Sequence, residues 1–101
     1  MAITSLPSSD GQELTILIQG RFDFGAHQDF RNAYERVSST PQRYTVDLKD
    51  TTYLDSSALG MLLLLRDHAG GDNSLIRLVN CNPDVRKILA ISNFEQLFNI
   101  A

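Results

Sequence analysis

Several features that mark common functional classes are scarce or missing in this sequence of 101 residues. The one cysteine, Cys81, excludes an internal disulfide bond and a metal site built on a Cys-x-x-Cys pair. No run is rich in lysine or arginine, and the formal net charge is −3. This argues against a nucleic-acid-binding protein, because phosphate contacts require a basic face. The longest purely apolar run, Met61 to Leu65, is far too short to span a membrane.

The composition that remains is that of one small globular domain. Apolar residues make up 43% of the chain and charged residues 21%, which separates it from disordered sequences. There is no internal repeat and no low-complexity segment, so we expect residues 1–101 to form a single domain. No basic segment followed by an apolar one opens the chain, and we therefore expect a cytoplasmic protein without a membrane-inserted part.

Alternating strand-like and helix-like periodicity predicts the order β-β-α-β-α-β-α. The expected strands cover residues 1–6, 13–19, 43–48 and 75–79. The expected helices cover residues 26–38 and 57–68, and a third starts at Asn82, with residues 93–100 as a tail containing one helical turn. The fold class is α/β. A right-handed crossover joins parallel strands, and the N-terminal hairpin makes the sheet mixed, with helices mainly on one face.

The most informative segment is Tyr53-Leu54-Asp55-Ser56-Ser57-Ala58-Leu59-Gly60, where a short apolar strand ends and an apolar helix begins. Ser57 should fall in the first helical turn, where backbone N–H groups lack helical partners and the helix dipole favours an anion. We expect Ser56 to cap the helix. Asp55 either caps it as well or belongs to a contact surface.

This segment resembles the core motif of the STAS family, named for sulphate transporters and anti-sigma factor antagonists. Gly20-Arg21-Phe22-Asp23 is similar to the family's Gly-x-x-Asp loop, and Tyr44-Thr45-Val46-Asp47-Leu48 to its central strand. The last elements also match, at Asn82-Pro83-Asp84-Val85 and at residues 93–98. The similarity covers essentially the whole chain. Its most specific part is Asp-Ser-Ser-Ala-Leu-Gly, in which Ala58 stands where the family often has glycine.

The resemblance implies an anti-sigma factor antagonist that acts by partner switching and is not an enzyme. Its partner would be an anti-sigma factor and serine kinase with a histidine-kinase-like ATPase fold. That kinase would bind the unphosphorylated form and release it once the second serine of the motif, Ser57, is phosphorylated; Ser56 is the weaker candidate. A metal-dependent serine phosphatase would restore binding. We expect no metal site, because His27 and His68 are far apart and have no Cys or Glu nearby at ligand spacing, and nothing in the composition indicates a cofactor.

The expected partner contacts surround this motif. They are Asp23, Asp55, Ser56, Ala58 and Met61, and Arg21 is expected to be a solvated residue. Asp23 should lie near Asp55 because both follow the carboxyl ends of strands. One or two of residues 61–65 should be exposed beside Ser57 as a docking patch, unless the third helix and the tail cover them.

Other functions remain open at this stage. An enzyme could use Ser56 or Ser57 as its nucleophile, but the Gly-x-Ser-x-Gly elbow is absent, and only His27 or His68 could act as the base. A constitutive STAS subunit of a larger complex, such as a lipid-transport ATPase, would use the same turn only to cap a helix. A sensory module for a nucleotide or small ligand is a further alternative.

Overall fold

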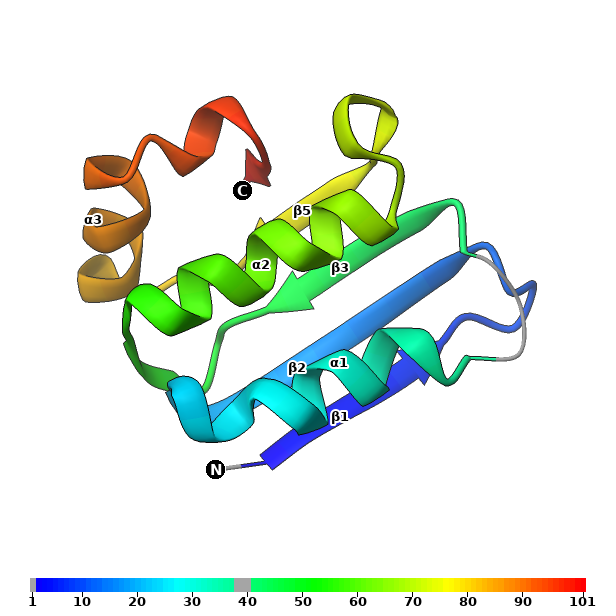
Figure 1. Ribbon diagram of the computed structural model, residues 1–101, viewed down its shortest axis with the longest axis horizontal. Coiled ribbons are helices and arrows are strands. Elements are labelled where there is room, and N and C mark those ends of the chain that lie inside the picture. The colour runs from blue at the N-terminus through cyan, green and yellow to red at the C-terminus, as the bar shows by residue number, and fades with distance from the viewer. Residues whose placement is uncertain (1, 38–40) are drawn as a thin grey trace.

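The computed structural model describes residues 2–37 and 41–101 of the chain (Figure 1). The strands are β1 (Ala2–Pro7), β2 (Glu13–Phe22), β3 (Arg43–Asp47), β4 (Thr51–Leu54), β5 (Ile76–Val79) and β6 (Asn99–Ile100). The helices are α1 (His27–Glu35), α2 (Ser56–His68) and α3 (Pro83–Ile91). Short 3-10 helices cover Phe24–Ala26, Gly71–Asn73 and Phe94–Gln96.

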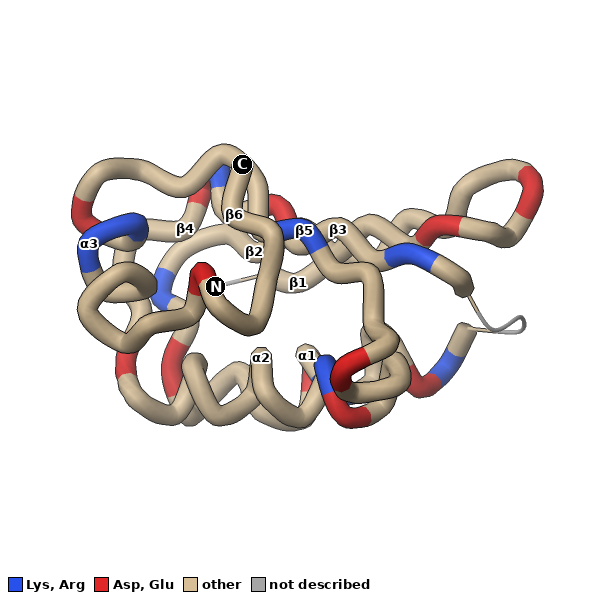
Figure 2. The backbone as a smooth tube through the Cα atoms, turned by 90° about the horizontal axis from the view of Figure 1, so that it is seen from above, with Lys and Arg blue, Asp and Glu red and all other residues tan. Residues whose placement is uncertain are grey.

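The strands form one mixed sheet in the order β1-β2-β3-β5-β6, with β4 also paired to β2. The β1–β2 pair is antiparallel, and the other pairs are parallel. Figure 2 shows α1 and α2 side by side on one face of the sheet and α3 at one end of it, where α3 packs against β4. The predicted α/β class, with a mixed sheet and helices mainly on one face, is confirmed.

The core lies between the sheet and the two helices that cover it. Alternate residues of β2 point into it, and Leu14, Ile16 and Ile18 have almost no exposed surface. Phe22 and Phe30 meet there with ring centroids 5.1 Å apart, which ties the end of β2 to α1. This packing fixes the carboxyl end of β2 against α1.

Two strands, β4 and β6, are absent from the predicted order, although the short apolar strand expected to end at Tyr53-Leu54 coincides with β4. β3 and β4 lie one after the other along β2: β3 pairs with the Glu13–Leu17 part and β4 with the part from Gly20 to Phe22. Gly20, at the shift in register, has a φ of 88° and donates its N–H to the carbonyl oxygen of Asp50 at 2.9 Å. A left-handed conformation of this kind favours glycine. The tail contains its short helix, as predicted, and then adds β6 to β5.

Helix boundaries differ from the prediction at α1. The helix starts at His27 because Ala26 belongs to the preceding 3-10 turn, and it ends at Glu35, before the predicted end. Ser38, the predicted last residue, and Met1, the predicted start of the first strand, lie outside the described residues. Gly70 ends α2 with a φ of 117°, as its position predicts, and Asn82 caps α3 by accepting the N–H of Val85 at 2.8 Å.

Candidate functional site

Two turns meet at the carboxyl ends of β2 and β4. Phe22 is the register partner of Leu54, and the N–H of Asp55 donates to the carbonyl oxygen of Phe22 at 3.4 Å. Asp23 and Asp55 therefore follow two paired residues of neighbouring parallel strands. The expected proximity of these two loops is confirmed.

Asp55 is the residue that caps α2. Its backbone is extended, with φ −106° and ψ −178°, and its Oδ1 accepts the N–H of Ala58 at 2.9 Å. The first helical hydrogen bond runs from Leu59 N–H to the carbonyl oxygen of Asp55 at 3.2 Å. The expectation that Ser56 caps the helix is therefore wrong, because Ser56 is already its first residue. The N–H groups of Ser56 and Ser57 precede the point at which helical bonding begins.

Exposure separates the predicted contact residues. Ser56 is exposed, and Ser57, in the first turn as predicted, is half-buried. Ala58 has 0% and Met61 3% of its surface exposed, and both belong to the hydrophobic core. The expected partner contacts of Ala58 and Met61 are corrected accordingly, since neither side chain reaches the surface. Asp23 and Asp55 are half-buried, with their carboxylates engaged in capping.

Arg21 is exposed, as expected, and it also makes two contacts. Its Nε lies 3.4 Å from Oδ2 of Asp23, and its guanidinium carbon lies 4.2 Å from the centroid of the Tyr53 ring. Asp23 also accepts the N–H of Gly25 at 3.1 Å with its other oxygen, which caps the 3-10 helix. Arg21 and Tyr53 are register partners in the β2–β4 pair. Their contact was not predicted, because the pairing of the strand at Tyr53-Leu54 with the end of β2 was not predicted.

Exposed apolar side chains lie farther along α2 and on the neighbouring 3-10 helix. On α2, Leu63 is 39% and Leu64 51% exposed, while Leu62 and Leu65 are fully buried. Seven residues separate Ser56 from Leu63, so the two share a helix face. Phe24 is 73% exposed, and its 3-10 helix packs against α2. We call Phe24, Ser56, Leu63 and Leu64 the docking face. The expected exposure of one or two residues in this run is confirmed.

The remaining chemistry-bearing residues do not form a site. In residues 2–37 and 41–101, no group of three or more His, Cys, Asp or Glu side chains is placed to hold a metal ion. The ring of His68 lies 4.9 Å from that of Tyr34, and His27 is half-buried. Burial raises the pKa of the half-buried Cys81 thiol, which disfavours the reactive thiolate. None of the helices described is long and apolar enough to cross a bilayer.

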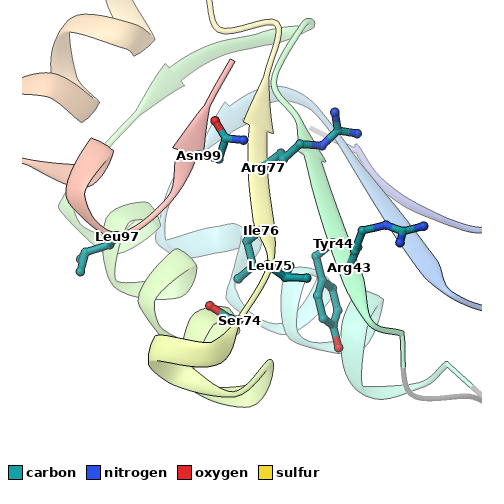
Figure 3. Close-up of a pocket in the computed structure, with 8 residues that line it drawn as sticks. All are labelled: Arg43, Tyr44, Ser74, Leu75, Ile76, Arg77, Leu97 and Asn99. Atoms are coloured by element: carbon teal, nitrogen blue, oxygen red, sulfur yellow. The ribbon is translucent and has the colours of Figure 1, made fainter.

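A hollow of about 260 Å³ lies at the opposite end of the sheet, where β3 and β5 begin (Figure 3). Arg43 and Arg77 lie at its margin. Their guanidinium nitrogens approach Oε2 of Glu13 at 3.4 and 4.0 Å, and Arg77 also donates to the hydroxyl of Thr45. The arginines are thus partly neutralised, and the hollow is separate from the serine turn.

Comparisons with known proteins agree on the family. The family model described as Mlab, STAS domain, matches residues 5–99. A STAS-domain containing protein of Pseudomonas aeruginosa (strain UCBPP-PA14) is 80% identical over 101 residues, which covers 100% of both chains.

Among solved structures, the anti-sigma factor antagonist SpoIIAA in its unphosphorylated form is 20% identical, with a TM-score of 0.78 over 99% of this chain and 88% of that one. The phosphorylated form of SpoIIAA from Bacillus is 17% identical, with a TM-score of 0.67 over 99% of this chain and 91% of that one. A sulfate transporter family protein from Wolinella succinogenes is 13% identical, with a TM-score of 0.73 over 91% of this chain and 84% of that one. The solved structures show the shared fold, and the sequence matches show that this chain belongs to the STAS-domain family.

Proposed function

We propose that this protein is an anti-sigma factor antagonist that works by partner switching. The docking face binds an anti-sigma factor that is also a serine kinase with a histidine-kinase-like ATPase fold. Phosphorylation of the turn that follows Asp55 releases the kinase, and a metal-dependent serine phosphatase restores binding. The observation that carries the proposal is the exposed Ser56 at the first position of α2, beside exposed apolar side chains. The chain is a binding module and a kinase substrate, not an enzyme.

Exposure favours Ser56 over Ser57 as the phosphorylated residue. A kinase must bring the γ-phosphate of ATP in line with the serine hydroxyl, and Ser56 is exposed whereas Ser57 is half-buried. The family resemblance points instead to Ser57. A phosphate on either residue would lie near the first N–H groups of α2 and the positive end of its dipole, so it would not require the helix to unfold.

Electrostatic repulsion is sufficient for the switch. A phosphoserine carries about −1.5 to −2 charges at neutral pH. At about 6 Å from one carboxylate of the partner, with an effective dielectric constant near 20, the repulsion is on the order of 4–5 kcal/mol before screening. A loss of about 2.7 kcal/mol lowers affinity a hundredfold. A phosphate inside the interface can therefore block docking while the fold stays intact.

Affinity capture from a lysate of the source organism tests the proposal. The baits are the Ser56→Ala, Ser56→Asp, Ser57→Ala and Ser57→Asp variants, with captured proteins identified by mass spectrometry. We expect both alanine variants to retain a kinase-like ATPase and the aspartate variant at the phosphorylated position to lose it. Equal recovery of the same proteins by all four baits would overturn the proposal.

A constitutive STAS subunit of a larger complex, such as a lipid-transport ATPase, is the second candidate. Its support is the cap itself, because Asp55 gives the turn a structural role that needs no phosphate. This candidate would be favoured if the alanine and aspartate variants at both serines captured an ATP-binding-cassette subunit equally well.

A further inference from the structure

The edge strand β1 has few of the features by which sheets usually protect their edges. It spans six residues at the margin of the sheet, and the sequence Ala-Ile-Thr-Ser-Leu-Pro carries no charge. A proline stands only at its end, and the register with β2 is continuous, with no bulge. Leu6, near the end of the strand, is 50% exposed. An uncharged edge of this length can pair with another strand.

A groove of about 490 Å³ runs between this edge and α1. Ile3 and Ser5 line it from the strand, and Asp29, Asn32 and Arg36 line it from the helix and its carboxyl end. These α1 residues follow the spacing of one helix flank, so the flank facing the free edge is acidic at one end and basic at the other. Within the described residues, neither Asp29 nor Arg36 takes part in an intramolecular ion pair.

We propose that β1 pairs antiparallel with β1 of a second copy, so that two chains form one continuous sheet around a two-fold axis. An axis through Thr4 places Ile3 opposite Ser5 of the second copy. It also places the exposed Leu6 opposite Ala2, which gives this leucine an apolar neighbour. An interface of this type uses the same patch on both chains, as two-fold symmetry requires.

The charges on α1 match this arrangement. The helix packs on β1 and β2 and runs in the direction of β1 (Figure 1). A two-fold axis at the edge therefore makes the two α1 helices antiparallel. Because α1 packs on both β1 and β2, its axis would lie about one strand spacing, about 4.8 Å, from the two-fold axis. The two helices would then be roughly 10 Å apart, which is a normal distance for packed helices. Asp29 of each copy would face Arg36 of the other, so that symmetry produces two equivalent ion pairs. Asn32 would lie near the axis.

A second copy fits this edge better than an unrelated strand, because the charge pattern is complementary to itself. The proposal goes beyond the proposed function and concerns a different surface. The β1 edge lies on the flank of α1 that faces away from α2 (Figure 1). The docking face on α2 would remain free in the dimer.

Sedimentation equilibrium of the full chain, from micromolar to millimolar concentration, tests the pairing. We expect a monomer–dimer equilibrium that Thr4→Lys weakens by more than tenfold, because two lysines would then face each other at the axis. Thr4 is exposed, so the monomer should stay folded, which circular dichroism checks. A wild-type chain that remains monomeric at all concentrations, or a dimer that Thr4→Lys leaves unchanged, overturns the proposal.

Charge reversal tests the helix contact separately. Asp29→Arg and Arg36→Asp should each weaken dimerisation by about tenfold, and the double variant should recover most of it. Lys87→Asp is the matched control, because it makes the same change of charge as Arg36→Asp on an exposed helical residue that does not line the groove. If the double variant shows no recovery, or the control weakens the dimer equally, the assigned geometry is overturned.

Discussion

At the residue scale, Asp55 and the serine that follows it have different roles: Asp55 caps α2, and Ser56 is exposed at the surface. Asp55 satisfies the N–H of Ala58 and leaves the hydroxyl of Ser56 exposed. Asp23 does the same for the adjacent turn and also holds Arg21 over the ring of Tyr53. The two aspartates therefore shape the surface on which a partner would dock.

Replacement of the α2 cap should cost measurable stability. Asp55→Ala leaves the N–H of Ala58 without its side-chain acceptor and should lower the free energy of unfolding by about 1 kcal/mol. Asp55→Asn should restore most of the loss, since asparagine caps as well as aspartate does. Urea denaturation measures both. Equal stability of Asp55→Ala and wild type would contradict the assigned cap.

Cys81 should react slowly in the folded protein. Burial raises the pKa of its thiol, so less thiolate is present at pH 8 than for an exposed cysteine. The stability that the buried thiol contributes is present below its unfolded pKa and is lost as the pH rises through the folded value. Iodoacetamide should alkylate the native chain several-fold more slowly than the chain in urea. Equal rates would show that the thiol is not protected.

At the element scale, sequence patterns reveal the long elements and the cap of α3, but not the pairing of the short strands. Leu14, Ile16 and Ile18 alternate and predict β2, and Asn82-Pro83 predicts the start of α3. β4 is four residues long and is defined by its pairing with the end of β2, which no local pattern contains. The contact between Arg21 and Tyr53 was missed for the same reason.

The candidate site was also predictable only in part: its position could be predicted, but the roles of its individual residues could not. The motif indicates the Asp55 turn, and the alternation of strands and helices predicts its proximity to Asp23. Which residue caps and which is exposed depends on the rotation of α2 against the sheet. That rotation buries Ala58 and Met61 in the hydrophobic core and leaves Ser56 and Leu64 outside, and α2 packs against α1.

Asn82 should stabilise two elements at once. Its Oδ1 caps α3, and its Nδ2 donates to the carbonyl oxygen of Thr51 in β4 at 2.9 Å. Asn82→Ala loses both bonds and should cost about 2 kcal/mol, whereas Asn82→Asp keeps the cap and should cost about half as much. Thermal unfolding distinguishes the two variants. Equal losses for both would mean that only one of the bonds matters.

At the scale of the whole molecule, one apolar run serves both the core and the surface. Leu62 and Leu65 are fully buried, whereas Leu63 and Leu64 are exposed on the docking face. The run is therefore longer than the core requires. Exposed leucines beside an exposed serine are typical of an interaction surface rather than of structural need.

A matched pair of substitutions separates these two roles. Leu62→Ala should lower the free energy of unfolding by about 3 kcal/mol, because it leaves a cavity in the core. Leu64→Ala should change stability by less than about 1 kcal/mol but weaken capture of the partner. Denaturation and affinity capture of both variants provide the measurement. Unchanged capture by Leu64→Ala would remove this residue from the docking face.

The most direct test of the central claim compares the two phosphorylation states of one preparation. The chain is phosphorylated with ATP by the ATPase that it captures, and tandem mass spectrometry locates the phosphate. Isothermal titration calorimetry then measures the affinity of each form for that ATPase in the absence of ATP. We predict a phosphate in the turn after Asp55, on Ser57 or Ser56, and an affinity at least a hundredfold weaker. A phosphate outside this turn, or affinities within twofold of each other, would contradict the account.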